Sequence, residues 1–334
     1  MKSIKLLDCT LRDGGYINDW KFGNEAIHDI SNKLVNSGID IVELGFLKNE
    51  QEDENRTVYN STKQLIPLIG KKKPDTLYAA MIDVQGRIPI EMVEPRTDET
   101  VDIIRVIVWK RLLQEDYEYC KQIVEKGYKL CVQPARVDQY SDDEFVSMIH
   151  QFEDLNPLAI YVVDSWGTLS IDDFLHYYYL IERELNENIA IGYHGHNNMQ
   201  QAFGIAETLL RQNSKHNLII DASVYGIGRG AGNLNTEIIS NFLNLKFQGK
   251  YVIDNYVYIY EKYIKKIYEE FKWGFSIPLF ITAMEKCNPE YGLFCQKNNV
   301  SETEIIQILN QLKGDDRIRF NKTLINELTS KNTK

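Results

Sequence analysis

The sequence predicts an α/β protein built as a (β/α)8 barrel with a helical extension at the C-terminus. Eight short runs rich in β-branched residues recur along the chain, and their starts are spaced by the length of a strand, a helix and two loops. Amphipathic helical patterns lie between these runs. Eight such units in roughly 240 residues match a (β/α)8 barrel in length as well as in number.

The expected strands follow one another at this regular spacing. They are Ile4–Leu7, Ile39–Leu44, Thr76–Ile82, Val101–Val108, Tyr128–Val132, Leu158–Val163, Ile189–Tyr193 and Leu218–Val224. After the first strand, apolar residues at helical spacing indicate a helix that begins near Asn24, its expected N-cap, and stops at Gly38. A second helical pattern starts at Ala202 and ends at Leu210.

An open, doubly wound sheet is the rival architecture. It usually has fewer strands in one domain and carries a glycine-rich GxGxxG turn after its first strand. Here that turn reads Arg12-Asp13-Gly14-Gly15, which favours the barrel. We therefore assign residues 1–246 to a barrel domain and residues 247–334 to a helical extension. A tyrosine-rich stripe in the extension indicates core or subunit interface, so we expect a homodimer through the C-terminal helices.

Composition restricts the partners of the chain. Its 48 acidic and 38 basic residues give a net charge of −10, which argues against nucleic acid or an anionic membrane as the main partner. We find no signal peptide at the N-terminus and no apolar stretch long enough for a membrane span. The five cysteines are scattered and odd in number, as expected of a reduced cytoplasmic protein.

Two polar segments mark a candidate metal site. His194 and His196 follow the seventh expected strand, and alternate residues of a strand point to the same side, so both can bind one ion. Asp13 follows the first strand, and a small-residue loop ending at Asn233 follows the eighth. Barrel closure places strands seven, eight and one side by side, with catalytic groups at their C-terminal ends.

This ligand set favours a divalent ion with open coordination positions. Asp13, His194, His196 and the Asn233 carbonyl suit octahedral Mn²⁺ or Mg²⁺, and Zn²⁺ would also accept an aspartate and two histidines. A 2-oxoacid could chelate such an ion, which would act as a Lewis acid and stabilise an enolate. Arg12 would add a fixed positive charge, giving the means to make or break a C–C bond beside a carbonyl.

These segments resemble the DRE-TIM metallolyase superfamily, also called HMG-CoA lyase-like. The resemblance covers Leu7 to about Glu237 and rests on five motifs in order: Asp8–Gly14, Val42–Gly45, Val163–Ser165, His194–Asn197 and Gly228–Asn233. It implies a metal on Asp13, His194 and His196, sometimes with Asn233. It also implies that Arg12 stabilises the enolate and that Glu43 is a buried acid orienting Arg12 or the metal's waters.

Within the superfamily, the chain looks most like the 4-hydroxy-2-oxovalerate aldolase branch. Asp164 and Ser165 end the sixth strand on the active rim and are expected to bind substrate. Aldolases of this kind place a histidine base just after the Arg-Asp-Gly segment, whereas this chain has Gly15-Tyr16 there. Tyr16 is a candidate replacement, although a phenol must be perturbed, or act as an acid, at neutral pH. The loop after strand eight lacks the catalytic cysteine of HMG-CoA lyase.

The leading functional hypothesis is a divalent-metal-dependent aldolase that makes or cleaves a 4-hydroxy-2-oxoacid from a 2-oxoacid and an aldehyde. The alternative is a Claisen-type condensation of an acyl-CoA with a 2-oxoacid, as in the isopropylmalate and homocitrate synthases. A third hypothesis is a Schiff-base aldolase using Lys110, after the fourth strand. A non-catalytic barrel is the last, and retention of the expected metal ligands argues against it.

Overall fold

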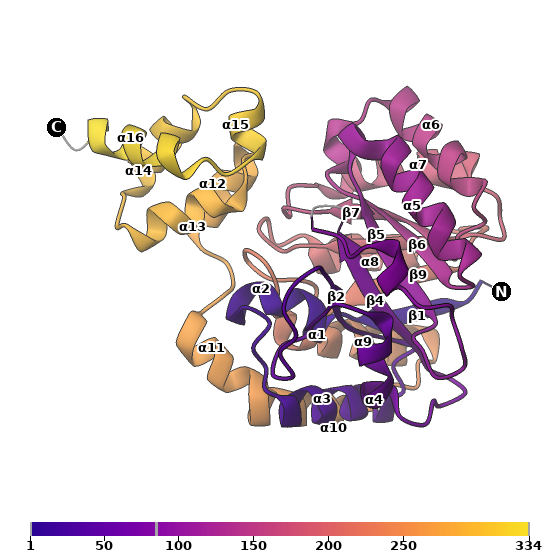
Figure 1. Cartoon of the computed structure of the whole chain (residues 1–334). Coiled ribbons are helices and arrows are strands. Elements are labelled where there is room, and N and C mark those ends of the chain that lie inside the picture. Colours follow the sequence, from indigo (N-terminus) through magenta and orange to yellow (C-terminus); the bar gives the residue numbers. More distant parts are fainter. Residues whose placement is uncertain (1, 84–85, 333–334) are drawn as a thin grey trace.

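The protein is a closed parallel β-barrel surrounded by helices, with further helices at its C-terminus (Figure 1). The computed structural model describes residues 2–83 and 86–332. The barrel strands are β1 (Ile4–Asp8), β2 (Ile41–Leu47), β4 (Leu77–Asp83), β5 (Ile103–Val108), β6 (Lys129–Pro134), β7 (Ala159–Asp164), β8 (Ala190–Gly195) and β9 (Leu218–Ala222). Because β1 pairs in parallel with both β2 and β9, the ring closes. The predicted (β/α)8 barrel is confirmed.

A two-residue strand, β3 (Val58–Tyr59), pairs with β2 outside the closed ring. The helices around the barrel are α1 (Thr10–Asp13), α2 (Gly15–Asn18), α3 (Asn24–Asn36), α4 (Ile66–Ile69), α5 (Leu113–Glu125), α6 (Asp142–Glu153), α7 (Ile171–Glu184), α8 (Ala202–Leu210) and α9 (Thr236–Phe247). In the described part of the β4–β5 connection, the helical structure is a single 3₁₀ turn, Ile90–Met92. Pro89 and Pro95 flank that turn and disfavour a longer helix.

The expected cap of α3 is wrong by one residue. Asn24 is the first helical residue, and Gly23 takes the N-cap position with a φ of 87°. Glycine adopts this left-handed backbone region without steric penalty, which fixes the entry of the chain into the helix. The helix ends at Asn36, and Gly38, with a φ of 81°, follows as the predicted stop.

The inside of the barrel changes character along its axis. One apolar cluster includes Leu7, Ile41, Ile103, Tyr161 and Ile219, one from each of several strands. Two residues further along three of those strands, the same strand face carries Glu43, Arg105 and Asp221, all fully buried. The barrel is therefore apolar toward the N-terminal ends of the strands and charged toward the C-terminal ends.

The C-terminal helices form two groups. α10 (Ile253–Ile259), the π-helical turn Tyr260–Ile264 and α11 (Lys265–Phe271) follow α9, and their buried residues belong to the main core. Tyr256 and Tyr263 reach α3 and its C-terminus, where their hydroxyls contact Ser37 and Asp29. The tyrosine stripe therefore packs, at least in part, within its own chain.

The second group has a hydrophobic core of its own. It comprises α12 (Ile277–Met284), α13 (Pro289–Lys297), α14 (Glu302–Leu309), α15 (Asp315–Ile318) and α16 (Lys322–Asn332). These helices form a lobe beside the barrel, coloured orange to yellow in Figure 1. Arg229, in the loop after β9, meets the lobe at Asn288 and Glu290. Within the described ranges, no helix is both long and apolar enough to cross a membrane.

Candidate metal centre and active site

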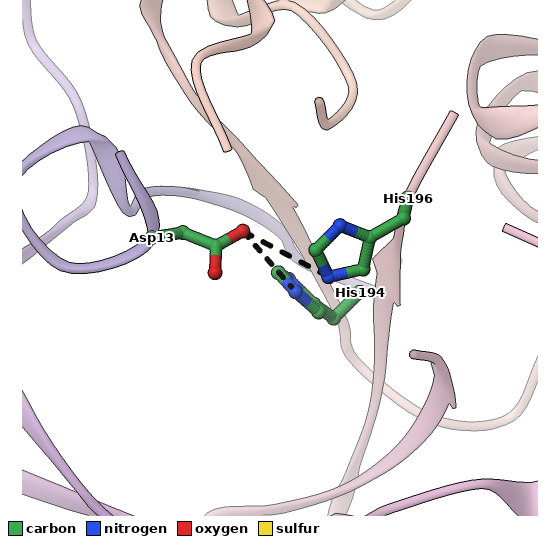
Figure 2. A group of neighbouring side chains, drawn as sticks. All are labelled: Asp13, His194 and His196. Atoms are coloured by element: carbon green, nitrogen blue, oxygen red, sulfur yellow. Dashed lines mark ion pairs between the residues drawn. The ribbon is translucent and has the colours of Figure 1, made fainter. Parts of the chain in front are cut away.

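Asp13 and the two histidines meet at the C-terminal end of the barrel, as the sequence predicts. Asp13 ends α1 directly after β1, His194 lies on β8, and His196 follows that strand. Asp13 Oδ2 lies 3.8 Å from His194 Nε2 and 3.9 Å from His196 Nε2 (Figure 2). All three side chains are buried, and each offers one ligand atom within 4.8 Å of the others. This spacing fits a single ion shared by the three residues.

Both imidazoles are oriented by contacts on their far side. His194 Nδ1 lies 3.0 Å from Asp221 Oδ2, and His196 Nδ1 donates to the Arg229 carbonyl at 3.1 Å. When Nδ1 carries the proton, the lone pair of each Nε2 is directed toward Asp13, as in metal-binding histidines.

The protonation states of His196 and Asp13 also suit a metal. Burial lowers the pKa of His196 to about 4, so its imidazole is neutral at pH 7. Burial opposes ionisation of Asp13, but Arg12 and the two histidines outweigh it and lower the pKa of Asp13 to about 2. A neutral imidazole and an ionised carboxylate are the forms that bind a divalent cation.

Asn233 joins this group from the β9 loop. Its Nδ2 donates to Asp13 Oδ2, while its Oδ1 is buried and lacks a hydrogen-bond partner within the described residues. A buried carbonyl oxygen is normally satisfied by a donor, water or ion. Because its side chain is hydrogen-bonded to Asp13, Asn233 can offer this orphaned oxygen as a fourth ligand to a divalent cation.

A buried network of charges surrounds the centre. Arg12 lies between two acids: Nη1 is 2.5 Å from Asp13 Oδ1, and Nε is 2.8 Å from Glu43 Oε2. Glu43 also contacts Arg105, at 2.9 Å, and Arg105 contacts Asp221, which orients His194. The network therefore returns to the histidine pair. Because its acids outnumber its arginines, a divalent cation would offset the excess negative charge.

A small cavity of about 100 Å³ opens beside the centre. Its lining includes Arg12, Asp13, Tyr16, Met81, Asp83, Ile107, Trp109, Gln133, Ala135, Arg136, Val163, Ser165, Trp166, His194, His196 and Arg229. Arg12 Nη2 is buried, and no described residue accepts a hydrogen bond from it. The cavity therefore combines a candidate metal centre with an unused guanidinium donor.

Tyr16 lines this cavity from α2. Its ring packs edge-on against Trp20 and Phe46, with the Arg229 guanidinium 5.8 Å from the ring centroid. Tyr16 is 39% exposed overall, and the partial burial of its phenol raises the pKa to about 12. The hydroxyl is therefore neutral near pH 7 and available as a proton donor. Gly15 permits this packing, because a Cβ on it would lie 1.9 Å from the Trp20 ring.

The two residues expected to bind substrate at the end of β7 differ in placement. Ser165 lines the cavity, and its Oγ accepts the backbone N–H of Arg136 at 3.1 Å. The Asp164 carboxylate instead accepts the backbone N–H groups of Thr168 and Leu169, at 2.8 and 3.1 Å. Asp164 thus fixes the loop after β7, and burial raises its pKa to about 6.

Several cavity and network residues were not anticipated from the sequence. Arg105 and Asp221 interrupt otherwise apolar strands, and a charge inside such a run is a recognisable signal. Gln133 and Arg136 lie at the C-terminal end of β6, where the barrel rule places functional groups. Lys110, the Schiff-base candidate, is already engaged by Glu144 and the Gln139 carbonyl, at 2.6 and 2.8 Å.

The fold and this rim of acids and histidines define a class: (β/α)8 barrels with a candidate divalent-metal centre at the C-terminal ends of the strands. Residues 3–257 match the family model described as HMGL-like. The chain therefore belongs to the HMGL-like family.

Curated relatives share about a quarter or less of their residues with the chain. An oxaloacetate decarboxylase of Mycobacterium tuberculosis is 23% identical over 242 residues, covering 70% of this chain and 68% of the relative. A 4-hydroxy-2-oxovalerate aldolase of Bacillus cereus is 22% identical over 241 residues, covering 71% of this chain and 69% of the relative.

Solved structures support the fold. The N-terminal domain of a candidate aldolase from Bacteroides vulgatus superposes with a TM-score of 0.67 at 21% identity, covering 94% of this chain and 98% of that one. The carboxyl transferase domain of Rhizobium etli pyruvate carboxylase superposes with a TM-score of 0.72 at 13% identity, covering 99% of this chain and 61% of that one.

Proposed function

We propose that this protein is a divalent-metal-dependent lyase that makes or cleaves a C–C bond of a 2-oxoacid through a pyruvate-type enolate. A 4-hydroxy-2-oxoacid is the favoured substrate class. The relatives named for aldol cleavage and for oxaloacetate decarboxylation both support this chemistry, because each named reaction can leave the same enolate of pyruvate. Mg²⁺ or Mn²⁺ is the expected ion, held by Asp13, His194, His196 and Asn233.

The main observation behind the proposal is the buried Arg12 guanidinium, which keeps one unused donor. Its guanidinium is buried and fixed by Asp13 and Glu43, yet Nη2 lacks an acceptor among the described side chains and backbone. A fixed donor of this kind beside a cavity can stabilise the negative charge that develops on the 2-oxo oxygen. A divalent ion bound beside it would polarise the same oxo group as a Lewis acid.

We assign to Tyr16 the role of proton donor to the oxygen of the aldehyde acceptor. In the condensing direction, its neutral phenol would donate its proton to the aldehyde oxygen as the new C–C bond forms, and the resulting phenolate would regain a proton from water. Ser165 lies on the cavity wall and would orient the 2-oxoacid. Glu43 does not line the cavity wall described above, so it acts as a positioning residue for Arg12.

The test is loss of the pyruvate methyl signal by proton NMR in D₂O, with Mg²⁺ or Mn²⁺ and with EDTA as the metal-free control. We expect exchange that requires metal and is lost in Asp13→Asn. Asp98→Asn is the matched control, because Asp98 is exposed and precedes β5, at the opposite end of the barrel. Metal-independent exchange, or none from folded, metal-loaded protein, would contradict the proposal.

A further inference from the structure

Arg136, which lines the cavity, has an unusual backbone conformation. It follows β6 and adopts the left-handed backbone region, with a φ of 56°, although it is not glycine. This backbone region is sterically unfavourable for a residue that carries a Cβ, so the surrounding structure must enforce it. The residue is 5% exposed, and its backbone N–H donates to Ser165 Oγ.

The guanidinium itself is fixed on two sides. Asp138 accepts from Nε at 2.6 Å and from Nη2 at 2.7 Å, forming a two-point clamp. The Trp166 ring covers one face, with its centroid 3.4 Å from Arg136 Cζ. These contacts leave one edge of the guanidinium unused, and Arg136 Nη1 is buried with no acceptor in the part of the chain that the structure describes.

Gln133 supplies a second unused donor from the same strand end. It is 2% exposed and lines the same cavity as Arg136. Its Nε2 is likewise buried without an acceptor in residues 2–83 and 86–332. Leaving a buried donor unsatisfied is costly, and two of them on one wall of a cavity indicate a missing acceptor group.

These donors face the candidate metal centre across the barrel. Around the closed ring, β6 is four strands from β1 in either direction, so the two strands lie opposite each other. Arg12 and Asp13 follow β1, whereas Gln133 and Arg136 lie at the end of β6, and all four line one cavity. A ligand held at both walls must carry an acceptor at each end.

We propose that Arg136 and Gln133 bind a second carboxylate, at the end of the substrate far from the 2-oxoacid group. The enzyme would then cleave a dicarboxylic 2-oxoacid, or it would condense a 2-oxoacid with an acceptor that carries a carboxylate. A carboxylate suits the site because only one edge of Arg136 is unused and the cavity is small. That the other end of the substrate is a 2-oxoacid rests on the proposed function. The carboxylate subsite at Arg136 and Gln133 does not depend on it.

The test compares ligands that differ only at that far end. Oxaloacetate is paired with 2-oxobutyrate and 2-oxoglutarate with 2-oxovalerate, so that a carboxylate replaces a methyl group at equal chain length. Binding to the Mg²⁺-loaded 334-residue protein is followed by tryptophan fluorescence, since Trp109 and Trp166 line the cavity. At least one pair should show tenfold or more tighter binding of the carboxylate-ended acid.

Variants assign this preference to the subsite. In Arg136→Gln, the affinity ratio of the discriminating pair should fall below threefold. Arg183→Gln, which changes an arginine with a 68% exposed side chain, should keep the wild-type ratio. If Arg136→Gln fails to fold because Asp138 loses its partner, Arg136→Gln/Asp138→Asn replaces it. No preference in the wild type, or a ratio unchanged in the Arg136 variant, overturns the inference.

Pyruvate exchange in D₂O separates this inference from the proposed function. Arg136-dependent discrimination without exchange would leave the subsite standing and overturn the lyase chemistry. Exchange without discrimination would support the lyase chemistry and overturn the carboxylate subsite.

Discussion

Asp221 Oδ2 lies 3.0 Å from His194 Nδ1, on the opposite side of the imidazole from Asp13. The same carboxylate contacts Arg105, so one buried acid connects a candidate metal ligand to the charge network inside the barrel. Burial opposes ionisation of Asp221, but Arg105 and His194 together outweigh it and keep the pKa of Asp221 below its ordinary value. His194 thus has an ionised acceptor behind it.

Asp221→Asn should weaken metal binding without removing a ligand. Loss of a partner that orients a metal-binding histidine typically costs roughly 10–100-fold in metal affinity. Calorimetric titration with Mn²⁺ measures the effect, with Asp98→Asn as the control. An unchanged Mn²⁺ affinity in folded Asp221→Asn would show that this contact does not support the metal centre.

Glu43→Gln should destabilise the barrel as well as slow catalysis. Glu43 contacts both Arg12 and Arg105, and removing one member of a buried ion pair typically costs about 3–5 kcal/mol of the free energy of unfolding. Chemical denaturation measures this loss, and Glu52→Gln in an exposed loop is the matched control. Equal stability of the two variants would contradict the inferred role of Glu43.

Tyr16→Phe tests the proton donor. With the phenol pKa at about 12, Tyr16 stays protonated across the neutral range, so the condensation rate should not fall through its ionisation between pH 7 and 9. Removing the hydroxyl should lower the turnover number for aldol condensation by about 10² or more, as for other general acid–base groups, with a smaller change in KM. Tyr179→Phe, on an exposed tyrosine, should retain the wild-type rate.

Asp8 should make stability depend on pH. Its carboxylate accepts hydrogen bonds from Thr10 and Thr236, but burial outweighs them and raises the pKa from 3.8 to about 6. The unfolded chain therefore loses this proton first, and the folded state loses relative stability as pH rises from 4 to 6.

Asp8→Asn should remove that pH dependence. Between pH 5 and 6.5, the wild type should lose about 1.4 kcal/mol of its free energy of unfolding relative to Asp8→Asn, equivalent to one pKa unit. Urea denaturation at the two pH values measures the difference. Parallel pH profiles of the two proteins would contradict this assignment to Asp8.

The barrel could be predicted because its strands are short apolar runs at a regular spacing. All eight form, with ends shifted by a few residues at most. The meeting of Asp13 with His194 and His196 follows from closure alone, since it needs only the order of strands around the ring. That part of the site follows from the strand order, which the regular spacing of the apolar runs predicts.

The far wall of the cavity depends on local geometry instead. Arg136 reaches its position through a left-handed backbone and a clamp from Asp138, neither of which has a periodic signature. Asp164 has the expected position in sequence, but backbone N–H groups of its own loop capture its carboxylate. Which way a rim side chain turns is decided by such contacts, and a motif alone does not specify them.

The closure of the ring has a kinetic consequence. Asp13 approaches the histidines only because β1 pairs with β9, and the paired residues Leu6 and Ile220 are more than two hundred positions apart in sequence. Contacts between such distant residues are slow to form, since the intervening chain must first be ordered. A refolding chain should therefore gain its metal affinity late, making ion uptake a reporter of the last stage of barrel assembly.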